Sequence, residues 1–248
     1  MTMNAVLRYP EVDMVRGIAI LMMILFHTVF DLSFFGISAV EVSSGFWKYF
    51  AYATASLFLL IVGISLTISH ARAATTLSGH HLALKFVYRG AGIFLLGLLV
   101  TVVTFLYLHE GYIVFGILHL IGVSVMISPL FFRFKKYNLV WGLLFIITGY
   151  FLTMIYGPAW LLPVGIHPAT FWSVDYEPVF PWTGIVLIGM GIGEYLYPGG
   201  VRKFAIPGIP SFFMQPLAFL GKHSLMIYLI HQPLIILLLA VVFDIPLI

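Results

Sequence analysis

Long apolar stretches alternate along the chain with short segments that contain most of the charged residues. A helix needs about 20 consecutive apolar residues to cross the hydrocarbon core of a bilayer. Charged residues delimit seven such stretches, at residues 17–30, 49–69, 90–108, 111–132, 137–166, 178–193 and 224–243. The pattern therefore predicts an all-α, polytopic membrane protein with seven transmembrane helices.

Two of these stretches depart from the length of a single span. The first is short unless it is extended to residues 14–35, which places Arg16 at one membrane interface and Asp31 toward the other. The fifth is too long, and a glycine and several prolines between residues 157 and 168 interrupt it. We expect that helix to end near Tyr156 and to be followed by an outer connector.

The composition agrees with a membrane protein and narrows the chemistry. Of the 248 residues, 62% are hydrophobic and 8% are charged, and the mean hydropathy is +1.10, which excludes a soluble enzyme core. The absence of cysteine from the sequence excludes thiol nucleophiles, disulfides and cysteine-ligated zinc or iron–sulfur clusters. We find no internal repeat or linker and predict one domain over residues 1–248, with no nucleic-acid partner.

The positively charged residues are distributed unevenly between the two ends of these helices. With seven crossings, every lysine and arginine except Lys48 falls on the side of the amino terminus. Cytoplasmic loops of membrane proteins carry such an excess of lysine and arginine. The sequence therefore predicts a cytoplasmic amino terminus and an external carboxyl terminus, and an even number of helices would spoil this separation.

Three histidines fall inside the predicted helices: His27, His119 and His231. An ionisable side chain near the bilayer centre costs about 2.5–3.5 kcal/mol on insertion scales, so each is a candidate for function. From the rise per helical residue, His27 and His119 both lie about 12 Å below the outer surface, and His231 lies close to the midplane. Each can instead be a packing residue that hydrogen-bonds a neighbouring helix. His231 can also hydrogen-bond polar groups of its own helix near Pro233.

The first helix carries the densest pattern of ionisable residues. Four of them fall within about 60° of one another around the helix axis and form one stripe: Asp13, Arg16, His27 and Asp31. Asp31 follows His27 by four residues, close enough to accept a ring N–H and raise the basicity of the imidazole. The stripe predicts that His27 is a general base and that the cation Arg16 lies on the same face of the helix, nearer its inner end.

The remaining polar residues have simpler interpretations. Asp175 and Glu177 occur in the outer connector, and for Glu177 a solvated loop carboxylate is the favoured interpretation. The glycines of residues 184–193 favour close helix packing over a nucleotide loop, because no strand precedes them. No H-E-x-x-H spacing or comparable pattern occurs, so we expect no metal site.

Several segments together resemble a known family. Residues 11–20, EVDMVRGIAI, with Phe26, His27 and Asp31, resemble the opening of the DUF1624 family, which groups prokaryotic proteins with the catalytic domain of heparan-α-glucosaminide N-acetyltransferase. Further similar segments are 56–65, 115–124, 174–176, 181–182 and 219–233. Arg16 and His27 also have the R-x10-H spacing of the wider transmembrane acyltransferase superfamily, in which the histidine is implicated in acyl transfer.

The resemblance implies transfer of an acyl group, commonly acetyl from acetyl-CoA, across a prokaryotic cell membrane to a sugar or envelope glycan. Acetyl-CoA or another acyl-CoA would be the cytosolic co-substrate, and an amine or hydroxyl outside would be the acceptor. Membrane lipid would surround the protein, and the resemblance leaves open whether the protein forms a homodimer. The lysosomal branch has Asn at the position of His27 and a candidate catalytic histidine after the first helix. Residues 37–45 contain no histidine here, so we assign the base to His27.

Combined with the stripe, the resemblance implies a two-sided site. His27 would remove the proton of the attacking group with Asp31 orienting it, while His119 or Tyr176 would polarise the thioester oxygen. Arg16 would bind CoA phosphate at the inner mouth. The other binding candidates are Arg89, Lys222 and His231 for the cofactor and Asp175, Tyr176 and Trp182 for the acceptor.

Alternatives remain at this point. Arg89 and Lys222 can be ordinary topology-setting charges. Direct transfer and an acyl-histidine intermediate both fit the residues. A proton-coupled transporter of a small polar or acylated substrate could also use a chain of His and Asp, although no inverted repeat is visible. A non-catalytic scaffold would leave the stripe unexplained.

Overall fold

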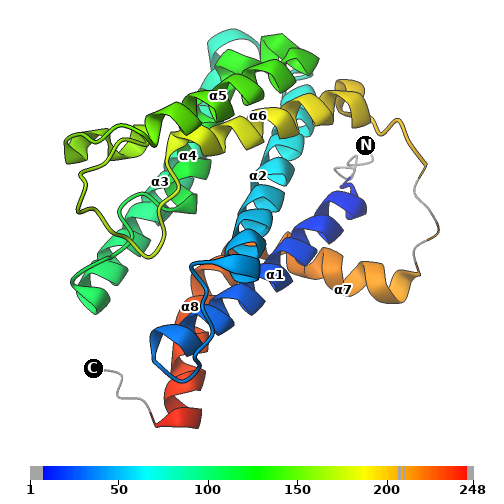
Figure 1. Cartoon of the computed structure of the whole chain (residues 1–248). Helices are drawn as coiled ribbons and strands as arrows, with labels where there is room; N and C mark the ends of the chain where they lie inside the picture. Colours follow the sequence, from blue (N-terminus) through cyan, green and yellow to red (C-terminus); the bar gives the residue numbers. More distant parts are fainter. Residues whose placement is uncertain (1–7, 206–207, 209, 245–248) are drawn as a thin grey trace. The chain divides into compact units, whose positions relative to one another are not determined.

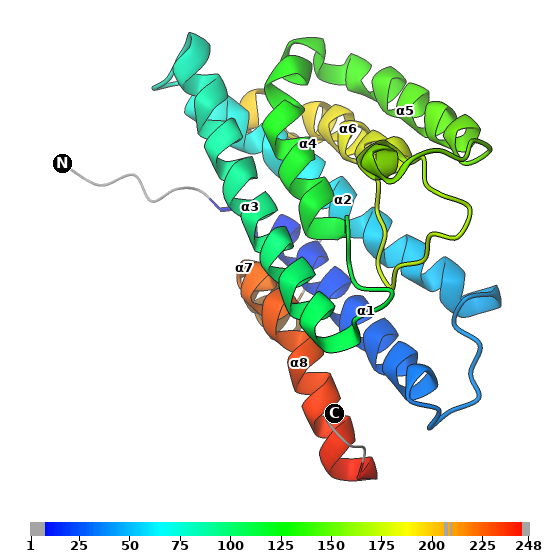
Figure 2. The same ribbon diagram turned by 90° about the vertical axis from the view of Figure 1, so that its left-hand side faces the viewer.

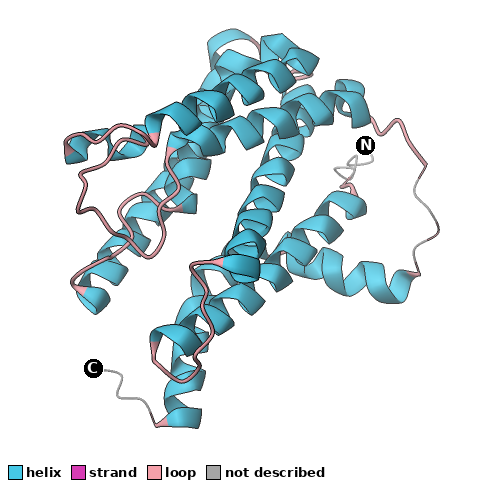
Figure 3. Cartoon of the chain, viewed as in Figure 1, coloured by secondary structure: helices cyan, strands magenta, loops and turns pink. Residues whose placement is uncertain are grey.

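Helices and the segments that join them form the computed structural model, which describes residues 8–205, 208 and 210–244 (Figure 3). Within these ranges no residue belongs to a strand, and extended backbone pairs only at the isolated bridges Phe115–Tyr176 and Tyr156–His167. The predicted all-α class is confirmed. The helices are α1 (Pro10–Phe34), α2 (Gly45–Ala73), α3 (Gly79–Leu108), α4 (Ile117–Phe131), α5 (Asn138–Leu152), α6 (Val179–Leu196), α7 (Ser211–Lys222) and α8 (Ser224–Phe243), with short 3-10 helices η1 (Phe132–Tyr137), η2 (Ala159–Val164) and η3 (Pro198–Gly200).

Six stretches in the described part of the chain are long and apolar enough to cross a membrane. They are α1, α2, α3, α6, α8 and the continuous stretch Ile117–Leu152. The last stretch accounts for the difference from the seven predicted helices, because it contains α4, η1 and α5. Lys135 in η1 has φ 47° and ψ −122°, which ends the helical path, and the chain turns over between α4 and α5 (Figure 2).

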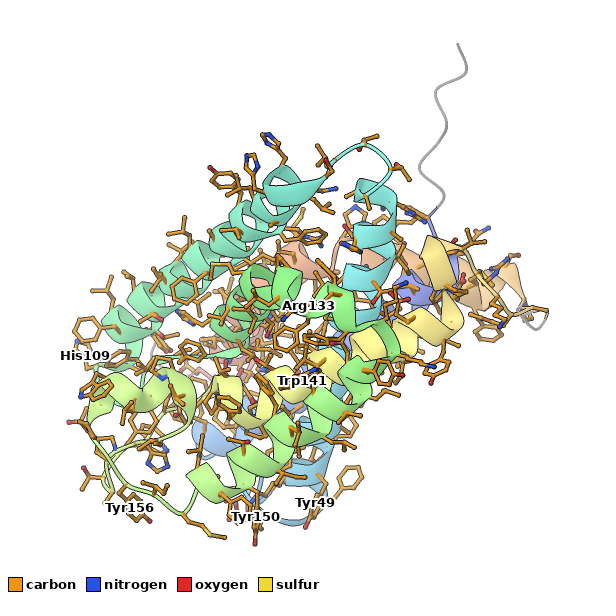
Figure 4. The ribbon with its side chains drawn as sticks, turned by 90° about the horizontal axis from the view of Figure 1, so that it is seen from above. Tyr49, His109, Arg133, Trp141, Tyr150 and Tyr156 are labelled. Carbon is orange, nitrogen blue, oxygen red and sulfur yellow. The ribbon has the colours of Figure 1, made fainter. Side chains whose placement is uncertain are left out.

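Exposed tyrosines lie at both ends of α5. Tyr137 directly precedes this helix, while Tyr150 belongs to its last turn and Tyr156 follows shortly after it; all three side chains are more than half exposed. Tyr150 and Tyr156 lie at the edge of the view in Figure 4, with Arg133 at the opposite end of the same segment. Tyrosine is enriched where a membrane span meets water.

The contacts within the chain divide it into two compact units, residues 1–58 with 205–248 and residues 59–204. In the first unit α1 packs against α7 and α8 (Figure 1). Two glycines allow this close approach: a Cβ at Gly17 would overlap the carbonyl oxygen of Leu217, and a Cβ at Gly221 would overlap that of Asp13. The helix α7 was not predicted, because its 12 residues with an internal Pro216 are too short for a span.

The second unit contains α3 to α6 and the later part of α2. α5 runs beside α6 and α3 beside α4 (Figure 1). The predicted close-packing role of the α6 glycines is confirmed: a Cβ at Gly184 would lie 2.6 Å from the carbonyl oxygen of Gly142 on α5. The core of this unit consists of buried apolar residues, among them Leu59, Phe86, Leu120 and Leu187.

Candidate functional site

The amino-terminal half of the predicted stripe meets α7. α1 begins with Pro10, and its first turn contains the acidic residues Glu11 and Asp13, which suit the positive end of a helix dipole. Nη1 of Arg16 donates to Oδ1 of Asp13 at 2.7 Å and to the carbonyl oxygen of Gly221 at 3.4 Å. The guanidinium is therefore held between its own helix and the end of α7, with its charge balanced by Asp13.

The other half of the stripe meets α8, where two histidine rings lie in contact. The ring centroids of His27 and His231 are 4.8 Å apart and the ring planes are nearly perpendicular, at 87°. Nδ1 of His231 lies 2.6 Å from the carbonyl oxygen of Tyr228, one turn earlier in α8. His231 is buried, and its Nε2 has no hydrogen-bond partner among the described residues.

Asp31 is paired differently from the prediction. Its side chain is buried, and both carboxylate oxygens accept hydrogen bonds from Nε2 of Gln232, each at 2.8 Å. A buried carboxylate needs a donor, and Gln232 supplies two N–H groups where His27 was expected to supply one. Sequence reasoning missed Gln232 as a site residue, although an amide beside His231 in an otherwise apolar helix was a visible signal.

His119 lies at the start of a helix in the second unit, not eight residues inside one as predicted. α4 begins at Ile117, because residues 111–116 form a loop that pairs with the connector. The ring of His119 stacks on Phe115 at 5.4 Å and meets Phe94 edge-on at 5.1 Å. Its Nε2 lies 3.4 Å from the hydroxyl of Thr101 on α3, a partner that the sequence did not reveal.

The connector is fixed to the entrance of α4 by its backbone. The amides of Val174 and Glu177 each donate, at 2.8 Å, to carbonyl oxygens of the loop before α4. Oδ2 of Asp175 accepts from the amide of Ile117 at 3.4 Å, so this carboxylate caps the amino-terminal end of α4. Gly116 is needed at this point because a Cβ would overlap the Asp175 carboxylate. The hydroxyl of Tyr176 donates to the carbonyl oxygen of Leu162 at 2.6 Å.

Burial changes the acid–base properties of the connector. It raises the pKa of Asp175 to about 6, although the hydrogen bond from Ile117 opposes this shift, and it raises the pKa of Tyr176 to about 12. Burial, with the nearby Asp175 carboxylate, holds the pKa of Glu177 well above its ordinary value. Oε2 of Glu177 is buried without a partner in the described structure, so the interpretation of Glu177 as a solvated carboxylate is wrong.

The remaining predicted residues occupy less enclosed positions. Trp182 is half-buried in α6 and packs against the core of the second unit. Arg89 on α3 and Lys222 at the end of α7 are exposed. In the part of the chain that the structure describes, no three His, Asp or Glu side chains lie close enough to hold a metal ion. Arg16, His27, Asp31 and His231 thus form an α1–α7–α8 group in one unit, and His119, Asp175 and Tyr176 form a group around the start of α4 in the other.

A model of the protein family described as "Heparan-alpha-glucosaminide N-acetyltransferase, catalytic" matches residues 8–233. The chain belongs to this family. The match covers both groups of buried polar residues and confirms the resemblance that the sequence segments indicated. Together with the apolar helices, membership assigns the chain to a family of membrane acetyltransferases. Comparisons with curated proteins and with solved structures found no match.

Proposed function

We propose that this protein is a membrane-embedded acyltransferase that takes an acetyl group from acetyl-CoA and transfers it to an amine or hydroxyl of a sugar or envelope glycan. The observation that carries the proposal is the family match, which extends over residues 8–233 and includes every candidate site residue. The buried ionisable groups of α1 and α8 add support, because such groups are costly within a membrane and are therefore rare there unless they serve a function.

The proposal includes a topology. We take α4 and α5 as separate crossings, which gives seven, with a cytoplasmic amino terminus and acyl-CoA approaching from that side. Support comes from the break at Lys135, from the exposed tyrosines at both ends of α5, and from the distribution of lysine and arginine. The connector with Asp175 would then lie on the external side, where the acceptor arrives.

His27 is the proposed base. The acceptor's nitrogen or oxygen forms a bond to the thioester carbonyl carbon, its proton passes to His27, and the carbon–sulfur bond breaks. The CoA thiolate leaves and takes up the proton from His27. Arg16 is the proposed phosphate ligand, with Arg89 and Lys222 as further cations; since Asp13 balances Arg16, phosphate would have to share or displace that carboxylate.

The predicted roles of His119, Asp175, Tyr176 and Trp182 are kept in the proposal. His119 or Tyr176 would donate to the thioester oxygen, and Asp175, Tyr176 and Trp182 would contact the acceptor. A proton-coupled transporter is the alternative, because the His27–His231 pair and Asp31 are also groups that could carry protons.

Reconstituted protein tests both functions. Labelled acetyl-CoA is supplied with a panel of amino sugars and glycans, and products are identified by mass. His27→Ala should lower turnover on the order of 10²–10⁴-fold, the usual contribution of a general base, while CoA binding persists. The matched control is Thr28→Ala, whose hydroxyl donates, among the described residues, to the Ile24 carbonyl of its own helix. Unchanged turnover in His27→Ala would exclude that base, and substrate-driven proton flux without acyl-CoA would favour the transporter.

A further inference from the structure

The hydrogen bond of His231 determines which of its ring nitrogens carries hydrogen. A carbonyl oxygen can only accept, so the 2.6 Å contact with Tyr228 requires that Nδ1 be the donor. In the neutral ring Nε2 then has a free lone pair. That nitrogen is buried and has no hydrogen-bond partner among the described residues. A buried acceptor without a donor is costly, which points to a proton or donor that arrives during function.

The ring of His231 lies against the ring of a second histidine. His27 lies edge-on to His231, with 4.8 Å between ring centroids. At that separation, rotation of the rings can bring facing nitrogens to hydrogen-bonding distance. Asp31, which was expected to hold His27, is occupied by both N–H groups of Gln232. Among the described residues of α8, His231 is the one in ring contact with His27.

We infer that His231 is the proton-accepting partner of His27, in the place that sequence reasoning gave to Asp31, and that the two rings act as a relay. This inference rests on the proposed acyl transfer. As the acceptor's proton binds one nitrogen of His27, the hydrogen on the other nitrogen of His27 passes to Nε2 of His231. His231 becomes an imidazolium held by Tyr228, and after the carbon–sulfur bond breaks the proton returns through His27 to the CoA thiolate.

The role differs from the cofactor-binding one predicted for His231, and the two have different kinetic consequences. His231→Asn keeps an amide N–H at the position of Nδ1, so the bond to Tyr228 can persist, but it removes the basic nitrogen. We expect kcat to fall on the order of 10²-fold with the Kd for acetyl-CoA unchanged. A higher Kd with kcat unchanged would assign His231 to the cofactor instead.

His223→Asn is the matched control. His223 makes the same kind of bond, from Nδ1 to the Phe219 carbonyl at 2.9 Å, but its side chain is exposed. We expect this variant to retain wild-type kcat. If His231→Asn retains it too, the histidine serves only packing and the relay is overturned.

A spectroscopic measurement separates this inference from the proposed function. Imidazole nitrogen NMR of the full chain should show Nδ1 of His231 protonated and Nε2 unprotonated, with the Nε2 signal shifted in His27→Ala. An Nε2–H tautomer, or a signal that does not respond to His27, overturns the pairing whatever the activity. A wild-type protein that shows the expected signals but transfers no acetyl would instead overturn the proposed function and, with it, the relay step.

Discussion

At the scale of single residues, Asp175 and Glu177 make stability depend on pH. Burial raises the pKa of Asp175 to about 6 and that of Glu177 well above normal, so both bind protons more tightly in the folded chain than in the unfolded one. The stability that their neutral forms allow is present at low pH and is lost as pH rises through the folded pKa values. For Asp175 the loss is about 3 kcal/mol at most, from the size of the shift.

We therefore expect the thermal midpoint of the purified protein in detergent to fall between about pH 5 and pH 7. Asp175→Asn should remove the part of this slope that ends near pH 6. Glu177→Gln should make the slope shallower both below and above pH 6, because the pKa of Glu177 rises from its ordinary 4.5 to well above that value in the folded chain. Glu41→Gln is the control, since Glu41 is exposed and hydrogen bonds from Ser43 lower its pKa. A midpoint that rises over this range, or a slope that survives in both variants, would contradict the assignment.

The residue scale also marks the limit of sequence reasoning. Hydropathy located His27, Asp31 and Arg16, because an ionisable group stands out in an apolar helix. It could not supply their partners, since Gln232 follows Asp31 by 201 positions and Gly221 follows Arg16 by 205. Which helices meet is decided by packing, so the nearest polar neighbour in sequence, His27 for Asp31, was the wrong partner.

At the scale of the helices, the contact of α1 with α7 depends on two glycines. Gly17→Ala and Gly221→Ala would each place a methyl group against a backbone carbonyl of the other helix. Overpacking of this kind costs about 1–3 kcal/mol, and backbone can yield less easily than a side chain. We expect both variants to lower the thermal midpoint and to weaken acetyl-CoA binding if Arg16, held at Gly221, is a phosphate ligand.

Gly92→Ala is a matched control for these variants. Gly92 is also helical, but a Cβ there would meet no atom within 4 Å, so the substitution should stabilise its helix by about 0.5–1 kcal/mol. Equal stability of all three variants would show that the α1–α7 contact is looser than described.

Long helices were predicted well and short ones poorly, for the same physical reason. Hydropathy detects a segment that must avoid water along its whole length, and α8 was predicted with its observed bounds. α7 has 12 residues and is stabilised by packing on α1. The apolar residues before Ile117 form a loop because the connector pairs with them. Neither effect leaves a periodic signal in the local sequence.

At the scale of the whole molecule, the path of the chain between Ile117 and Leu152 decides where the connector lies. As one crossing, this stretch would put the connector on the side of Ser78; as two, on the side of Ser44. α4 and α5 have 15 residues each, which at the helical rise gives about 23 Å, so each needs the adjoining turns to span a bilayer of about 30 Å. The break at Lys135 and the cations around it favour two crossings.

Single-cysteine labelling distinguishes these paths, and the sequence contains no cysteine of its own to remove. Ser44→Cys, Ser78→Cys and Thr170→Cys each alter an exposed residue outside the spans. With a membrane-impermeant maleimide on intact cells, we expect Ser44→Cys and Thr170→Cys to react and Ser78→Cys to react only after lysis. If Thr170→Cys behaves like Ser78→Cys, Asp175 and Tyr176 lie on the side from which acyl-CoA is proposed to approach. That result would exclude these residues as the binding site of an acceptor on the opposite side of the membrane.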